Sequence, residues 1–159
     1  MKTVVDTSAL IALLYPDDKH NERAANLLGE ARSEGATVVN PITYAELSAD
    51  GFFGSAEELD AFFEDTGVRV EEAEDETLFR SGKAFQEYLG ARGDSLQCPD
   101  CGEKKIFDCP SCGNEITARQ HLPADFLIGA HAEKQADTLV TFDTGFFDAY
   151  FNVETRGVR

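Results

Sequence analysis

The sequence predicts an α/β protein, a three-layer α/β/α sandwich around a central parallel sheet of about five strands. Short β-branched runs alternate with segments that carry apolar residues at helical spacing through most of the chain. Such alternation is typical of a parallel sheet with helices on both faces. The 159 residues, 42% of them hydrophobic, suit about one domain with a substantial core.

The first strand is expected at residues 2–6, where β-branched residues dominate. An apolar helical segment at residues 9–14 and a charged helix at residues 18–33 follow it, and Gly35 ends the charged helix. Residues 37–39, Thr-Val-Val, are expected to form the second strand.

Helix-start signals mark the next two helices. Asn40 is a good N-cap and Pro41 suits the first helical position, so a helix is expected to begin there. Ser55 and Glu58 form a capping box ahead of a second apolar-periodic segment. The remaining expected elements are a strand at 68–70, a helix at 71–89 ending at Gly90, a helix opening at Leu122–Pro123, and strands at 138–142 and 151–154.

The chain is strongly acidic, since 30 Asp and Glu against 14 Lys and Arg give a net charge of −16 at pH 7. A broad basic face for nucleic acid is therefore disfavoured, and an anionic substrate must be held by local cations or bound metal. Scarce lysine and scattered acids are typical of halophilic proteins, in which salt screens the self-repulsion. An ordinary acidic soluble protein is the alternative explanation.

No segment of the sequence predicts a membrane span or a secretion signal. The longest apolar stretch, Ala9–Tyr15, is too short to cross a bilayer. No basic region followed by an apolar one opens the chain. We therefore expect a cytoplasmic protein without a membrane partner.

Four cysteines lie in an irregular segment that interrupts the α/β pattern. They form two Cys-x-x-Cys pairs, each followed by glycine: Cys98, Cys101, Cys109 and Cys112. This spacing predicts a tetrahedral, structural Zn²⁺ site, although iron suits the same four thiolates. Two disulfides are the alternative, but they require an oxidising compartment.

The position of the cysteines suggests a small module inserted into a host domain. We expect a zinc-ribbon module at residues 94–117, folded as a short hairpin with Lys104 and Lys105 at its tip. The host domain then consists of residues 1–93 and 118–159, whose ends at the insertion can lie close together.

Acidic residues stand at the carboxyl ends of the expected strands. Asp6 follows the first strand, Asp143 follows the strand at 138–142, and Asp125 falls in the first turn of the helix leading into that strand. Glu46 lies on the helix after the second strand. Ligands of open parallel sheets bind beyond the carboxyl ends of the strands. If the two strands are neighbours, the four acids converge on a pocket suited to Mg²⁺ or Mn²⁺.

Each acid also has an ordinary explanation, because Asp and Glu are common in a first helical turn.

Other kinds of active site fit the sequence less well. The sequence contains neither a phosphate-binding Gly-x-x-x-x-Gly-Lys loop nor a Gly-x-Ser-x-Gly elbow. The histidines, His20, His121 and His131, show no spacing typical of metal ligands.

Four segments of the chain resemble, in order, the acidic motifs of PIN-domain ribonucleases, and most closely those of the VapC-type toxins. They are residues 4–10, 43–47, 123–130 and 139–143. The resemblance implies a five-stranded parallel α/β/α sandwich that cleaves RNA with Mg²⁺ or Mn²⁺. It covers the chain apart from the cysteine segment.

The resemblance also implies roles for individual residues. Asp6 and Asp125 would be the main catalytic metal ligands, and Glu46 and Asp143 would bind a second ion directly or through water; Asp148 is the alternative to Asp143. Thr7, Ser8 and Thr141 would form supporting hydrogen bonds around the site. Arg119 and His121 are either substrate contacts or surface residues of a linker.

The leading hypothesis is a metal-dependent endoribonuclease that acts as the toxin of a toxin–antitoxin pair. A PIN endonuclease that matures ribosomal RNA is the enzymatic alternative, since those enzymes also carry a zinc ribbon. A non-catalytic, zinc-stabilised PIN-fold binding protein is the alternative from another class. The toxin resemblance implies a homodimer and an antitoxin partner. The segments around Phe52–Phe53 and Phe62–Phe63 carry more apolar surface than one side of a helix needs, so they are the candidate interface.

Overall fold

The computed structural model describes residues 1–92, 95–97, 103–116 and 122–157. Five strands form a sheet in the order β3-β2-β1-β6-β7, and every neighbouring pair in it is parallel. The strands are β1 (Lys2–Val5), β2 (Ala36–Val39), β3 (Val68–Val70), β6 (Thr138–Val140) and β7 (Glu154–Arg156). The expected fold class and the expected number of strands are confirmed.

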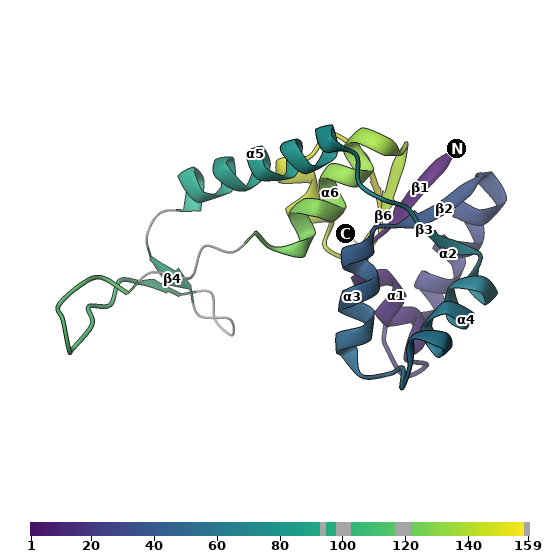
Figure 1. The fold of residues 1–159 in the computed structure, drawn as a ribbon, viewed down its shortest axis with the longest axis horizontal. Coiled ribbons are helices and arrows are strands. Elements are labelled where there is room, and N and C mark those ends of the chain that lie inside the picture. Colours follow the sequence, from purple (N-terminus) through teal and green to yellow (C-terminus); the bar gives the residue numbers. More distant parts are fainter. Residues whose placement is uncertain (93–94, 98–102, 117–121, 158–159) are drawn as a thin grey trace.

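Helices cover both faces of this sheet (Figure 1). They are α1 (Thr7–Leu14), α2 (Asn21–Glu34), α3 (Pro41–Asp50), α4 (Ala56–Thr66), α5 (Asp75–Arg92), α6 (Ala124–Gln135) and α7 (Thr144–Tyr150). Successive strand residues point to opposite faces, so Val5 packs with α1 to α4 and Val4 packs with α5 to α7. The strands are buried on both faces because each face has its own apolar layer.

The expected starts of α3 and α4 agree with the structure, whereas α2 begins at Asn21 and α5 at Asp75, later than the expected residues 18 and 71. The Asn40 side chain accepts a hydrogen bond from the Thr43 amide, with Pro41 at the start of α3. Ser55 caps α4 by accepting from the Glu58 amide. The Glu58 carboxylate accepts from the amide of Gly54, not from that of Ser55, so the capping box is displaced by one residue.

Two expected boundaries are wrong for identifiable reasons. The last strand is β7 (Glu154–Arg156) and does not include Phe151. The Phe151 ring packs into the core against Gly129, so closely that a Cβ atom on Gly129 would overlap the ring. Helix α5 continues through Gly90 to Arg92. An interior glycine costs a helix only about 1 kcal/mol, which packing can offset.

The position expected for the lysine pair is also wrong. Lys104–Lys105 is not a hairpin tip but strand β5, which pairs antiparallel with β4 (Leu96–Gln97). This second sheet lies beyond the end of α5, apart from the five-stranded sheet (Figure 1). A bridge between Asp108 and Glu115 follows it along the chain.

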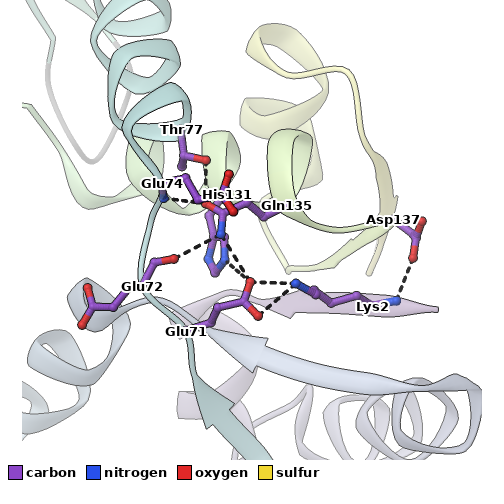
Figure 2. A network of polar contacts seen from close by, with 8 residues as sticks. All are labelled: Lys2, Glu71, Glu72, Glu74, Thr77, His131, Gln135 and Asp137. Atoms are coloured by element: carbon purple, nitrogen blue, oxygen red, sulfur yellow. Dashed lines mark hydrogen bonds and ion pairs between the residues drawn. The ribbon is translucent and has the colours of Figure 1, made fainter.

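A polar network holds α6 against the sheet (Figure 2). His131 on α6 is fully buried, and its Nε2 lies 3.2 Å from Oε1 of Glu71, just after β3. Both carboxylate oxygens of Glu71 accept hydrogen bonds of 2.9 Å from Lys2 Nζ on β1. Gln135 binds the same carboxylate and accepts from the Thr77 hydroxyl on α5. The network therefore ties α6, which begins beside Asp125, to β1 and to the segment after β3.

Among the described residues, no helix is long and apolar enough to cross a membrane.

Candidate active site

The sheet topology brings two distant parts of the chain together at the candidate site. Strands β1 and β6 are neighbours, with Val5 beside Val140. The Asp6 amide continues the pairing by donating to the Val140 carbonyl at 2.9 Å. Asp6 and the segment after β6 therefore occupy the same edge of the sheet, where ligands of parallel sheets bind.

Two hydroxyl groups hold the Asp6 carboxylate. Its Oδ2 atom accepts hydrogen bonds from Ser8 Oγ at 2.5 Å and from Thr141 Oγ1 at 2.9 Å. Both hydroxyl oxygens in turn accept from consecutive backbone amides, Phe142 to Ser8 at 3.2 Å and Asp143 to Thr141 at 2.9 Å. The orientation of Asp6 is thus set by the loop between β6 and α7.

Asp6 is 4% exposed. Burial raises the pKa of its carboxyl group, and the hydrogen bonds from Ser8 and Thr141 oppose that rise. A divalent cation would favour the ionised form, because it supplies the charge that burial removes from water.

Glu46 is held by a third hydroxyl group. Thr7 Oγ1 donates to Glu46 Oε2 at 2.5 Å. Thr7 begins α1 and Glu46 lies in α3, so this bond joins the two helices at the site. The three side chains expected to support the site, Thr7, Ser8 and Thr141, all donate to a candidate acid.

Asp125 lies in the first turn of α6, as expected, although Pro123 occupies the N-cap position and Ala124 the first helical one. Partial burial, and then the charges of Asp6, Glu46 and Asp143, raise the pKa of its carboxyl group to about 6. The residue still keeps an exposed surface. Asp125 is therefore close enough to each of the other three candidate acids for their charges to act on it.

Asp143 and Asp148 have different surroundings. Asp143 caps α7 by accepting from the Phe146 amide, and its charge acts on Asp125. Asp148 accepts from the Thr155 hydroxyl at 2.7 Å and is not among the groups that act on Asp125. These contacts favour Asp143 as the fourth acid of the cluster.

The donor set fits a hard divalent cation. Carboxylate oxygens are the preferred ligands of Mg²⁺ and Mn²⁺, and a cation would relieve the repulsion that raises the pKa of Asp125. Within the described part of the chain, no three Asp, Glu, His or Cys side chains are already close enough to form a complete ligand set. Binding would therefore draw the carboxylates closer together.

Half of the expected cysteine site can be described. Cys109 and Cys112 are not in a disulfide, and Cys98 and Cys101 lie outside the described residues. Gly113, at φ 74°, turns the chain so that its amide donates to the Cys109 carbonyl at 2.8 Å. The backbone amides of Ser111 and Cys112 hydrogen-bond to Cys109 and lower the pKa of its thiol.

A ring stack beside the site could not be predicted from the sequence, which shows only that a phenylalanine stands between Thr141 and Asp143. The His20 ring stacks on Phe142, with ring centroids 4.8 Å apart and planes at 23°. The other candidate substrate contacts, Arg119 and His121, lie outside the described residues.

Comparison with solved structures shows that other proteins share this fold. Two solved structures are similar in fold: VapBC2 from Rickettsia felis, bound to a DNA fragment from their promoter, and VapBC-1 from nontypeable Haemophilus influenzae. The first aligns with a TM-score of 0.62 at 19% identity and the second with 0.61 at 18%. Each alignment covers 99% of this chain and 98% of the other.

No curated protein matches the sequence. The PIN domain family matches residues 3–109, which is more than half of the chain. This match includes Asp6 and Glu46, and the parallel sheet with its acidic edge is the arrangement that the motifs predict. The chain therefore belongs to the PIN-domain family.

Proposed function

We propose that this protein is a metal-dependent endoribonuclease that hydrolyses RNA phosphodiester bonds. The observation that carries the proposal is the sheet topology, which places Asp6 after β1 and Asp143 after the neighbouring β6, with the hydroxyl group of Thr141 hydrogen-bonded to both. The charges of Asp6, Glu46 and Asp143 also act on Asp125, which agrees with this arrangement. PIN domains are in general metal-dependent nucleases, which supports the same conclusion.

Asp6 and Asp125 would hold Mg²⁺ or Mn²⁺, with Glu46 and Asp143 as ligands of a second ion or of bound water. A bound ion supplies hydroxide near neutral pH and offsets the charge that develops on the phosphate. Ser8 and Thr141 fix one oxygen of Asp6, and Thr7 fixes one oxygen of Glu46, so both carboxylates are oriented in advance. Without a cation, the same carboxylates would repel RNA.

Purified protein should cut single-stranded or loop RNA with Mg²⁺ or Mn²⁺ and should lose that activity in EDTA. Asp6→Asn and Asp125→Asn should each abolish cleavage, because each removes charge from the metal site without changing side-chain volume. Asp148→Asn is the matched control, since it removes an acid outside the cluster. Full activity of both site variants would exclude the assignment.

We further propose that the enzyme is the toxin of a toxin–antitoxin pair, with an antitoxin that covers the acidic edge. The similarity in fold to two VapBC structures, over nearly the whole chain, supports this role. Expression in a host should arrest growth unless a small open reading frame next to the gene is expressed with it. Normal growth of the expressing host would contradict the toxin role. Accumulation of unprocessed ribosomal RNA in a strain that lacks the gene would favour ribosomal RNA maturation.

The cysteine segment supports a second candidate function, ribosomal RNA maturation. The turn at Cys109–Gly113, with backbone amides directed at sulfur, suits a structural Zn²⁺ site. We propose that Cys98, Cys101, Cys109 and Cys112 bind one Zn²⁺, with residues 94–117 as the inserted module.

We propose that the protein forms a homodimer through its exposed aromatic residues. Phe63 is buried in the core, whereas Phe52 is 49% exposed and contacts Tyr15 and Phe53. An aromatic surface of this kind suits an interface between subunits. Light scattering should report a dimer, and Phe52→Ser should shift it toward monomer; a monomer at every concentration would contradict the proposal.

A further inference from the structure

A stacked pair of rings forms part of the edge of the acidic site. His20 precedes α2 and lies against Phe142, whose own amide donates to Ser8. Both rings are partly exposed. Because Phe142 stands between Thr141 and Asp143, the stack lies directly beside the residues that hold Asp6.

A polar hollow lies beside α2, the helix that His20 precedes. It has a volume of about 410 Å³, and its lining includes Arg23 and Glu30 of α2, Thr144 at the start of α7 and Arg156 of β7. Arg23 follows His20 by three residues, so the two share one side of the first turn of α2. Thr144 follows Asp143 directly, which connects the hollow to the acidic site.

The two arginines of the hollow differ in their partners. Arg156 is held by Glu34 at 2.7 Å and by Glu154 at 3.0 Å, so its charge is largely offset. Arg23 is exposed and forms no ion pair with any residue that the structure describes. In a chain with a net charge of −16, an unpaired guanidinium beside a phosphodiester site is available to an anionic ligand.

The hollow is in direct backbone contact with the acidic site. The Thr141 amide donates to the Arg156 carbonyl at 3.0 Å. Gly157 approaches the Thr141 carbonyl oxygen so closely that no side chain would fit there. The segment that binds Asp6 and the segment that lines the hollow are therefore packed against each other.

We propose that His20, Arg23, Phe142 and Thr144, here called the site rim, bind the nucleotide next to the scissile phosphate of a single-stranded RNA. The Arg23 guanidinium contacts the backbone phosphate, with the Thr144 hydroxyl as a second donor. An unpaired base stacks on His20 and extends the His20–Phe142 stack, as aromatic side chains do in many single-strand-binding sites. The inference rests on the proposed nuclease function and assigns the contacts that position its substrate.

The phosphate contact is tested with Arg23→Gln. Arg32→Gln is the matched control, because it removes the same charge from the far end of the same helix. We expect Arg23→Gln to raise KM for single-stranded RNA about tenfold with kcat within about twofold, and to reduce the slope of log KM against log salt by about 0.7. Arg32→Gln should change neither. Equal values for the two variants would overturn the phosphate contact.

The base contact is tested with His20→Ala and His20→Phe. We expect His20→Ala to weaken binding about tenfold and His20→Phe to retain it, since phenylalanine preserves the stacking surface. RNA with an abasic site at the neighbouring nucleotide should bind equally to wild-type protein and to His20→Ala. A loss in His20→Ala that persists on abasic RNA would refute stacking.

Binding measurements separate this inference from the nuclease assignment. Fluorescence anisotropy with labelled RNA, in an Asp125→Asn background with Mg²⁺, reports binding without turnover. If RNA binds through Arg23 and the wild type does not cleave it, the site rim stands and the nuclease function fails. If the wild type cleaves RNA and Arg23→Gln binds it unchanged, the nuclease stands and the site rim fails.

Discussion

Thr141 Oγ1 donates to Asp6 Oδ2 at 2.9 Å, and the same oxygen accepts from the Asp143 amide, also at 2.9 Å. The hydroxyl group therefore connects two candidate metal ligands that follow different strands, Asp6 after β1 and Asp143 after β6. Because Thr141 is fully buried, bulk water cannot take the place of its hydroxyl group when that group is removed.

Replacing Thr141 should therefore impair activity more than folding. Thr141→Val keeps the volume of the side chain but removes the hydrogen bond to Asp6, and such a loss around a metal site reduces activity or metal affinity by about 10- to 100-fold. Thr141→Ser should retain most of the activity because it keeps the hydroxyl group. Steady-state cleavage and Mn²⁺ titration measure both effects, and equal rates for valine and serine would contradict the assigned role.

Asp125 should destabilise the metal-free protein at neutral pH. Its folded-state pKa of about 6 lies above the ordinary value of 3.8, so the folded state holds the proton more tightly and loses stability as the pH rises between these values. Asp125→Asn should therefore raise the melting temperature in EDTA by about 2 °C or more at pH 7.5, a modest gain because solvent screens the site.

The gain from Asp125→Asn should disappear near pH 4, where the wild-type carboxyl group is protonated in the folded state. Asp148→Asn serves as the control at both pH values. A lower melting temperature for Asp125→Asn than for wild type at pH 7.5, without metal, would show that the acids do not repel one another.

The strands of the sheet and the positions of the acids at strand ends were predictable because both depend on local patterns. Asn40 and Pro41 determine where α3 begins, and strand ends determine where Asp6 and Asp143 lie. The error at β7 came from Phe151, which with Val153 resembles a strand until the space left by Gly129 is known. The His20–Phe142 stack was not predictable, because it depends on how α2 packs beside the loop after β6.

The network in Figure 2 should contribute measurably to stability. Burial raises the pKa of Glu71, but hydrogen bonds from Lys2 and His131 outweigh that rise, so the pKa is lowered overall. Glu71→Ala leaves these partners unsatisfied and should reduce the free energy of unfolding by about 1–2 kcal/mol at pH 7. Glu72→Ala, at an exposed neighbour, should change it by less than about 0.5 kcal/mol.

The same network should make the fold sensitive to acid. Burial lowers the pKa of His131 below 6.5, so the unfolded chain binds the proton first and stability falls as the pH drops through about 6.5. The contribution of Glu71 is present above 4.5 and is lost at lower pH. Urea unfolding between pH 4 and 8 checks this, and a stability that stays constant below pH 6.5 would contradict it.

The cysteine segment should hold one metal ion more tightly than the acidic site does. Elemental analysis after treatment with mild chelator should find Zn²⁺ in wild type and none in Cys112→Ser, with Glu103→Gln, at an exposed residue of the same segment, as control. Structural zinc contributes on the order of 10 kcal/mol to folding, so Cys112→Ser should disorder the module. Iron in place of zinc would colour the protein, and four reactive thiols in metal-replete protein would refute the site.

The net charge of −16 predicts a response to salt. The screening length falls from about 10 Å at 0.1 M to about 3 Å at 1 M salt, so the acids repel one another less. If the protein is adapted to salt, its melting temperature should rise between these KCl concentrations, and cleavage should persist. A falling melting temperature would exclude the halophilic interpretation and leave the nuclease assignment unchanged.

The placement of β1 at the centre of the sheet has a consequence for folding. Asp6 and Thr141, which orients it, are 135 positions apart in the sequence. Contacts of such long separation carry a high loop-closure entropy and form slowly. A fragment that contains only β1 to β3 would therefore present Asp6 without the hydroxyl group that orients it.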